Sequence, residues 1–145
     1  MTNSSKTPLA PLAQSWLTLW NGDFSQAEAL IAPDFRVHAA LLGGGDGSAL
    51  SGPQGLTRWI AQTRAALADL TFQVEVGPIG QGDLIALRWQ AVGTYAGGFP
   101  GAAAPAGTAI AMSGTDLLRV RGGQLAEYWV NSDMHALLAQ LQVKG

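Results

Sequence analysis

The chain has 145 residues, of which 48% are hydrophobic and only 12% are charged, and its formal net charge is −2. This length suits one domain with a sizeable core, and the charge pattern has no basic cluster for a nucleic-acid partner. The absence of cysteine excludes disulfides, thiolate metal sites and a cysteine nucleophile.

The N-terminal residues do not have the pattern of a targeting segment. Residues 1–11 are polar and contain proline, with one lysine and no apolar core, so we expect no signal peptide and a disordered lead-in over residues 1–7. No apolar run approaches the roughly 20 residues that span a bilayer. We therefore expect a single domain over residues 8–145 that works in the cytoplasm, away from membranes.

The first half of the chain has the periodicity of helices. Apolar residues recur at three- and four-residue steps up to Trp20, as on one face of a helix, and Asn21-Gly22 ends the pattern. A glycine-rich loop over residues 43–53 lacks the following Lys-Ser/Thr of a phosphate-binding loop. The expected elements are helices over residues 8–20 and 26–31, a short strand over 35–39, and a helix that begins at residue 52.

The second half changes to a period of two, which is typical of strands. Gly80-Gln81-Gly82-Asp83 is a hairpin signal between two alternating runs. Helices followed by hairpin-linked strands indicate an α+β domain, with the helices on one face of a curved antiparallel sheet. Such a cone has an apolar interior that suits a small apolar ligand. The expected strands cover residues near 71–76, 84–95, about 108–120 and the run from 124, before a last helix over 134–141.

The run that begins at Gln124 ends in a carboxylate, Asp133, just before the last helix. Glu127, Trp129 and Asn131 share one face of this strand. Asp133 has two interpretations. It caps the helix, since aspartate is a favoured N-cap residue, or it is a general base that Trp129 shelters from water.

Short motifs follow one another in order from Trp16 to Leu141. Together they resemble, in order and spacing, the SnoaL-like polyketide cyclases of the NTF2-like superfamily, whose fold is a cone-shaped α+β barrel. The motifs are Trp20-Asn21-Gly22-Asp23, Gly52-Pro53-Gln54-Gly55, Gly93-Thr94-Tyr95-Ala96-Gly97 and the segment from Arg121 to Trp129, with Asp133 after it.

The resemblance implies a cofactor-free aldol catalyst that closes the last ring of aromatic polyketides, usually as a homodimer. In that chemistry an aspartate removes a proton from carbon flanked by carbonyls, and the enolate then attacks a ketone of the same molecule. Asp133 is the best match for this aspartate, and Asp116, on an apolar strand, is the alternate. Relatives often carry histidine where this chain has Tyr95, which can donate a hydrogen bond to an oxyanion but cannot act as a base near neutral pH.

The remaining candidates are single residues. His38, at the end of the first strand, is either a catalytic group or a hydrogen-bonded structural residue. Asp133 and His135 lack a third metal ligand at a suitable spacing, so no metal site is expected. With five tryptophans in the chain, we expect at least one to line the cavity. The candidate substrate-binding residues are Trp20, Arg88, Gln90, Tyr95, Trp129 and Asn131.

Two other functions fit the same fold. The first is limonene-epoxide-hydrolase-like activity, for which Arg88 must reach Asp133 inside the cavity, although Gln90 stands where that chemistry has an acid. A steroid-isomerase-like proton shuttle is a variant of this function. The second is a non-catalytic module that binds a small apolar ligand or only dimerises, since fold does not determine function. In a module we expect every cavity carboxylate to be ion-paired, whereas an enzyme would leave Asp133 or Asp116 desolvated in the cavity.

Overall fold

A computed structural model describes residues 9–39 and 50–143 of the chain. Its sheet has five strands in the order β1-β5-β4-β3-β2. The β2–β3, β3–β4 and β4–β5 pairs are antiparallel, as expected from the hairpins. The elements are α1 (Leu9–Trp20), α2 (Ala27–Leu30), β1 (Ile31–His38), α3 (Gly52–Ala66), β2 (Leu67–Gln81), β3 (Leu84–Tyr95), β4 (Ala109–Arg121), β5 (Gln124–Ser132) and α4 (Met134–Gln140).

The edge strand β1 departs from the expected antiparallel pattern, because it runs parallel to β5. It is connected to β2 through α3 rather than through a hairpin, and this longer connection carries the chain to the opposite edge of the sheet. Strand β1 also begins earlier than expected, at Ile31, and includes Pro33. Pairing with β5 is irregular between Ile31 and Arg36, so the proline lies in a stretch without regular ladder bonds.

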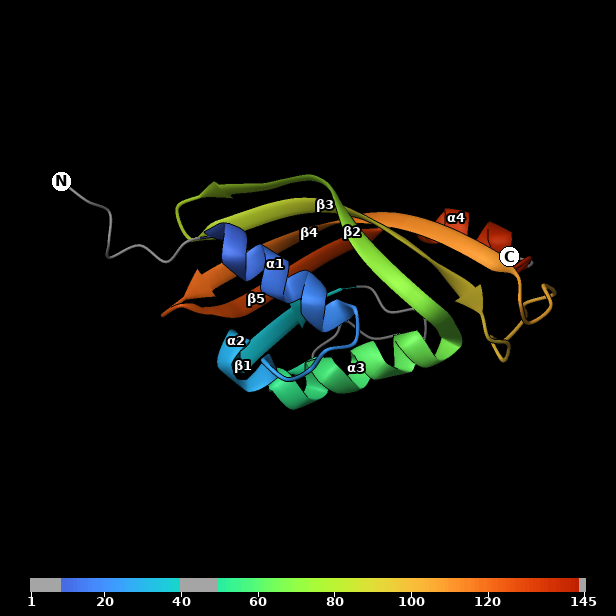
Figure 1. Ribbon diagram of the computed structural model, residues 1–145, viewed down its shortest axis with the longest axis horizontal. Helices are drawn as coiled ribbons and strands as arrows, with labels where there is room; N and C mark the ends of the chain where they lie inside the picture. The colour runs from blue at the N-terminus through green and yellow to red at the C-terminus, as the bar shows by residue number, and fades with distance from the viewer. Residues whose placement is uncertain (1–8, 40–49, 144–145) are drawn as a thin grey trace.

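The helices α1 and α3 lie on one face of a strongly curved sheet (Figure 1). Strand β2 has register shifts between Val74 and Val76 and between Val76 and Ile79, and such irregularities bend a strand. Figure 1 shows β2 turning sharply above α1. The fold class is therefore the expected α+β arrangement, and its curvature leaves a concave face toward the helices.

The inner face of the sheet and one side of α1 form the core. Every second residue of β3 from Ile85 to Ala91 is buried, in agreement with the alternation in the sequence. On α1, Trp16 and Trp20 pack against Tyr128 of β5, with ring centroids 4.7 and 6.5 Å from the tyrosine ring. Burial of each large side chain contributes roughly 1.5–3 kcal/mol, so this aromatic contact fixes α1 against the sheet.

The end of α1 is fixed to β2 by side-chain bonds to backbone. The Asn21 amide accepts a hydrogen bond from Phe72 N at 2.7 Å and donates one to Phe72 O at 3.2 Å. Arg64 of α3 donates to the carbonyl oxygens of Trp20 and Leu70. The predicted end of the first helix at Asn21-Gly22 is confirmed, with Gly22 at φ 102°. The contacts of Asn21 and Arg64 also hold Trp20 beside Phe72 of β2.

Most expected boundaries agree with the structure to within a few residues, and β3 spans the expected residues 84–95. Strand β2 is longer than expected at both ends, because its pairing with β3 begins at Leu67 and continues past Val76 to Gln81 despite the register shifts. The lead-in over residues 1–7 and the glycine-rich loop up to residue 49 lie outside the described residues. Within residues 9–39 and 50–143, none of the helices has the length and apolar character needed to cross a membrane.

Gly114 gives a test of the packing between β3 and β4. A Cβ atom at this position would overlap the Trp89 indole and lie 2.9 Å from the Asn131 backbone oxygen. We expect Gly114→Ala to lower the free energy of unfolding by about 1–3 kcal/mol, because the buried indole must move. Urea unfolding measures this. Ser113→Ala, next in sequence, should cost much less, and equal stabilities of the two variants would contradict this packing.

Candidate active site

A pocket of about 640 Å³ lies between the helices and the concave face of the sheet. Its walls come from α1, α3, α4 and the inner faces of the strands, and they are mostly apolar. A carboxylate, Asp116, belongs to this lining, and no lysine or arginine of the described chain does. Aromatic side chains contribute much of the wall, namely Trp20, Trp59, Phe72, Trp89, Tyr95, Phe99 and Tyr128.

Asp116 is the buried charged residue of this pocket. It lies on β4, faces inward between Leu87 of β3 and Val130 of β5, and is only 2% exposed. Within the described residues, no other charged side chain is buried to this degree. A buried carboxylate is costly unless hydrogen-bonded, so its partners decide what it can do.

Three neutral donors from three elements hold the Asp116 carboxyl group. Trp16 Nε1 donates to Oδ2 at 2.9 Å, and Trp89 Nε1 donates to Oδ1 at 2.8 Å. The Tyr128 hydroxyl donates to Oδ1 at 3.3 Å. No ion pair to Asp116 is present in residues 9–39 and 50–143.

Burial raises the pKa of Asp116 to about 6, although the hydrogen bonds from Trp16, Trp89 and Tyr128 act in the opposite direction. Burial and the neighbouring carboxylate raise the pKa of Tyr128 well above its usual value of 10, so its hydroxyl stays protonated. Asp116 is therefore a carboxylate at neutral pH that is more basic than an exposed one.

Other residues with polar groups also line the pocket, including Tyr95, Trp20 and Asn131. The Tyr95 hydroxyl oxygen accepts a hydrogen bond from Phe99 N at 2.7 Å, which leaves the hydroxyl proton available to a ligand. Trp20 Nε1 is buried without a hydrogen-bond partner in the described part of the chain. Asn131 lines the pocket near the end of β5. Of the expected substrate-binding residues, the structure thus brings Trp20, Tyr95 and Asn131 to the same pocket as Asp116.

Asp133 lies elsewhere. Its side chain is exposed and does not belong to the pocket lining, so the expected shelter beside Trp129 is absent. It occupies the N-cap position of α4, but its side chain makes no capping hydrogen bond. Its backbone N–H donates to Ser113 O at 2.8 Å, because the chain leaves β5 there while still paired with β4. The Asp133 side chain is therefore in contact with solvent and outside the pocket.

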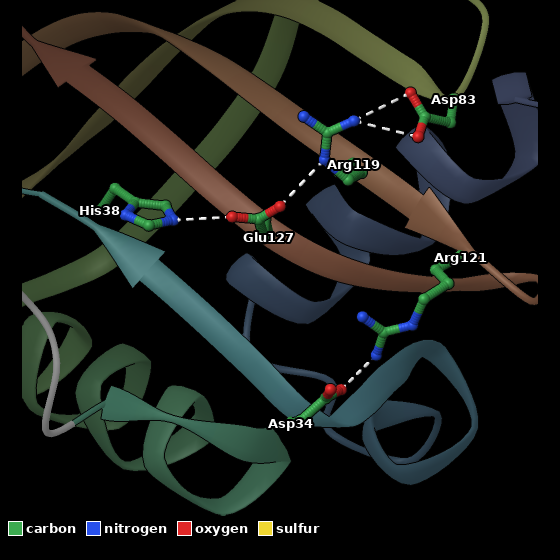
Figure 2. Close-up of polar contacts among 6 residues, drawn as sticks. All are labelled: Asp34, His38, Asp83, Arg119, Arg121 and Glu127. Carbon is green, nitrogen blue, oxygen red and sulfur yellow. Dashed lines mark hydrogen bonds and ion pairs between the residues drawn. The ribbon is translucent and has the colours of Figure 1, made fainter.

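His38 and Trp129 lie on the outer face of the sheet. Figure 2 shows a chain of polar contacts there, in which Glu127 binds His38 and Arg119, each at 2.9 Å, and Arg119 reaches Asp83. The His38 ring also stacks on Trp129, with centroids 4.9 Å apart. The structure therefore gives His38 the hydrogen-bonded environment that was one of its two interpretations, and neither residue lines the pocket.

Arg88 and Gln90 are exposed on β3, also outside the pocket. Arg88 pairs with Glu75 at 2.9 Å rather than with an aspartate of the cavity. The epoxide-hydrolase hypothesis required Arg88 to meet Asp133 inside the cavity, and that expectation is wrong. Among the described residues, no group of three or more histidines, aspartates and glutamates could hold a metal ion.

The sequence indicated Asp116 only as an alternate and did not indicate its indole donors. Trp16 and Trp89 have the apolar spacing of core residues, and their N–H groups meet at Asp116 only after α1 packs across the sheet. The available signal was the parity of Asp116, which shares the inward face of β4 with Leu118. A carboxylate on a buried face requires hydrogen-bond donors from the elements packed on it.

Comparisons with known proteins agree with this architecture. The family described as SnoaL-like polyketide cyclase matches residues 10–141. IdmH from Streptomyces antibioticus, a candidate polyketide cyclase, is 31% identical, with a TM-score of 0.77 over 92% of this chain and 98% of that chain. TsrD from Streptomyces laurentii is 20% identical, with a TM-score of 0.78 over 99% of both chains. No curated protein sequence matches the chain significantly.

A third similar structure has a different assigned activity. AclR from Streptomyces galilaeus, a candidate hydroxylase, is 23% identical, with a TM-score of 0.74 over 92% of this chain and 80% of that chain. At this identity, AclR and TsrD show only that the NTF2-like fold is shared. The choice of chemistry must therefore come from the side chains of the pocket.

The buried carboxyl group predicts a specific dependence of stability on pH. Because folding raises the pKa of Asp116 from 3.8 to about 6, its contribution is complete at low pH and is lost as the pH rises through about 6. Relative to Asp116→Asn, the wild type should lose about 2 kcal/mol of unfolding free energy between about pH 4 and pH 7. Urea unfolding of both proteins measures this. A difference that does not change with pH would contradict the raised pKa.

Proposed function

The chain belongs to the SnoaL-like polyketide cyclase family, and we propose that it is a cofactor-free acid–base catalyst in which Asp116 moves the proton. The proposal depends above all on the Asp116 carboxylate, which is buried in an apolar pocket without an ion-pair partner in the described residues. A carboxylate kept away from cations retains its basicity, whereas a salt bridge would reduce it.

The proposed substrate is a small, mostly apolar compound with a C–H group between two carbonyls and a ketone in the same molecule. Asp116 takes the proton, and the electron pair of the broken C–H bond becomes an enolate. The enolate carbon then forms a bond to the ketone carbon, whose oxygen becomes an alkoxide. The Asp116 carboxylic acid returns its proton to this alkoxide, so the ring closes with no net change in protons or electrons.

The pKa of Asp116 suits both halves of this reaction. At about 6 it leaves the group mostly ionised at neutral pH, and the acid formed in the first step can still donate its proton readily. The apolar wall supports the same conclusion, because a low local dielectric strengthens interactions with the developing charge.

Tyr95 is the proposed donor to the substrate oxygen. Its hydroxyl oxygen already accepts the Phe99 N–H, and a hydroxyl that accepts one hydrogen bond becomes a better donor of the next. The phenol is therefore suited to stabilise an enolate or alkoxide in this pocket.

The non-catalytic binding module is the second candidate. For that function we expected each cavity carboxylate to be ion-paired, and Asp116 has no such partner in the described residues. Its burial without a cation costs folding free energy, which supports a catalytic role over simple ligand binding.

Asp116→Asn tests the proposed base. We expect turnover of a fused-ring aromatic β-keto ester with a pendant ketone to fall by a factor of at least about 100, because the amide cannot accept the proton. Product formation is followed by chromatography. Asp133→Asn is the matched control, since it makes the same change at an exposed site, and it should retain the wild-type rate. If Asp133→Asn were inactive and Asp116→Asn active, Asp133 would be the base instead.

Tyr95→Phe tests the proposed oxyanion donor. The change removes one hydroxyl group from the pocket wall and leaves the ring in place. We expect kcat for the same β-keto ester to fall by about 10- to 100-fold, with a smaller change in KM, because the bond strengthens as charge develops on oxygen. A wild-type kcat would remove Tyr95 from the mechanism.

A further inference from the structure

The three donors to Asp116 are divided unequally between its two oxygens. Oδ1 accepts the Trp89 indole N–H at 2.8 Å and the Tyr128 hydroxyl at 3.3 Å. Oδ2 accepts only the Trp16 indole N–H, at 2.9 Å, within the described residues. The donors come from β3, β5 and α1, so the carboxyl group is held from three sides.

An ionised carboxylate offers about two lone pairs on each oxygen. Two donors occupy both lone pairs of Oδ1, whereas a single donor binds Oδ2 and leaves its second lone pair free among the described residues. We infer that Oδ2 of Asp116 is the oxygen that takes up and returns the proton, and that Trp16, Trp89 and Tyr128 are positioning residues that impose this choice. The catalytic use of that proton rests on the proposed function, but its location on Oδ2 does not.

None of the three donors can take the proton from Asp116. An indole nitrogen donates its hydrogen and accepts none, which applies to Trp16 and Trp89. Burial keeps Tyr128 in its protonated form, since its pKa is raised well above 10. A proton placed on Oδ2 therefore cannot pass to these neighbours, and it returns to the ligand in the pocket.

No charged side chain of the described residues competes with these donors. Helix α1 contains no ionisable residue, and on α3 Arg64 is bound to backbone carbonyls. Arg88 of β3, Arg119 of β4 and Glu127 of β5 form ion pairs on the outer face of the sheet. Among the described residues, Tyr128 is the one titratable group in direct contact with Asp116, so burial and the three donors control the protonation of Asp116.

The indole N–H groups report directly on the carboxyl group without any substrate. Protonation at Oδ2 turns the acceptor of Trp16 into a weaker hydroxyl oxygen, while Oδ1 remains a carbonyl acceptor for Trp89. In ¹H–¹⁵N spectra recorded from about pH 4 to pH 8, both signals should move with one shared midpoint near pH 6. The Trp16 proton should move further than the Trp89 proton, and the Trp20 signal, which lacks a described partner, should stay nearly still.

Three variants complete the measurement. Trp16→Phe and Trp89→Phe assign the two signals, and Asp116→Asn should abolish both titrations. A larger movement of Trp89 than of Trp16 would place the proton on Oδ1 and overturn the inference. It would equally be overturned if neither signal titrated, or if both still titrated in Asp116→Asn.

Tyr128→Phe tests the positioning role separately. Loss of its hydroxyl frees a lone pair on Oδ1 and removes a bond to the charged form, so the shared midpoint should rise by about one pH unit. Tyr95→Phe is the matched control. It also removes a hydroxyl group from this pocket, but that hydroxyl accepts a hydrogen bond from Phe99 N and makes none to Asp116. An unchanged midpoint in Tyr128→Phe, or an equal rise in Tyr95→Phe, would contradict the role of Tyr128. If Tyr128→Phe does not fold, the comparison of Trp16 with Trp89 in the wild type still decides the inference.

The two proposals fail in different ways. If Asp116→Asn kept its turnover while the wild-type indoles titrated as described, the proposed function would be wrong and the assignment of Oδ2 would stand. If turnover were lost but Trp89 moved further than Trp16, Asp116 would remain the base and Oδ1 would be its reactive oxygen.

Discussion

The hydrogen bonds to the buried Asp116 carboxyl group connect the helix α1 to the strands of the sheet. Trp16 brings α1 to this group, Trp89 brings β3, and Tyr128 brings β5, so one charge sets the relative positions of three elements. The same side chains belong to the aromatic core, where Trp16 and Tyr128 pack with ring centroids 4.7 Å apart. Core packing and the orientation of the candidate base therefore depend on the same residues.

This arrangement is costly for folding and useful for chemistry. A hydrophobic residue in place of Asp116 would avoid the desolvation of a charge, and neutral donors compensate that cost only in part. The polar network on the outer face shows the contrast, because Glu127 there is hydrogen-bonded to His38 and ion-paired with Arg119, and those contacts lower the pKa of Glu127. The Glu127 carboxylate on the outer face is therefore a weak base, whereas the Asp116 carboxylate beside the apolar pocket is a stronger one.

The sequence predicted most of the architecture and much less of the site. Periodicity located β3 at residues 84–95, and Asn21-Gly22 marked the end of α1, because local backbone preferences and burial act over short distances. The parallel pairing of β1 depends on a long connection and could not be obtained from local patterns. Asp133 looked more important than Asp116 because its motif is conspicuous along the chain. The indole donors of Asp116 lie 100 and 27 residues away and meet it only in the folded protein.

The central claim is that Asp116 removes a proton from carbon in this pocket. The most direct measurement is the exchange of the carbon-bound hydrogen of a fused-ring β-keto ester with D₂O, followed by NMR over a range of pH. The account predicts that the wild-type protein accelerates exchange, that the rate rises as Asp116 ionises near pH 6 and then levels off, and that Asp116→Asn gives only the rate of buffer. Equal exchange in the wild type and Asp116→Asn would contradict it.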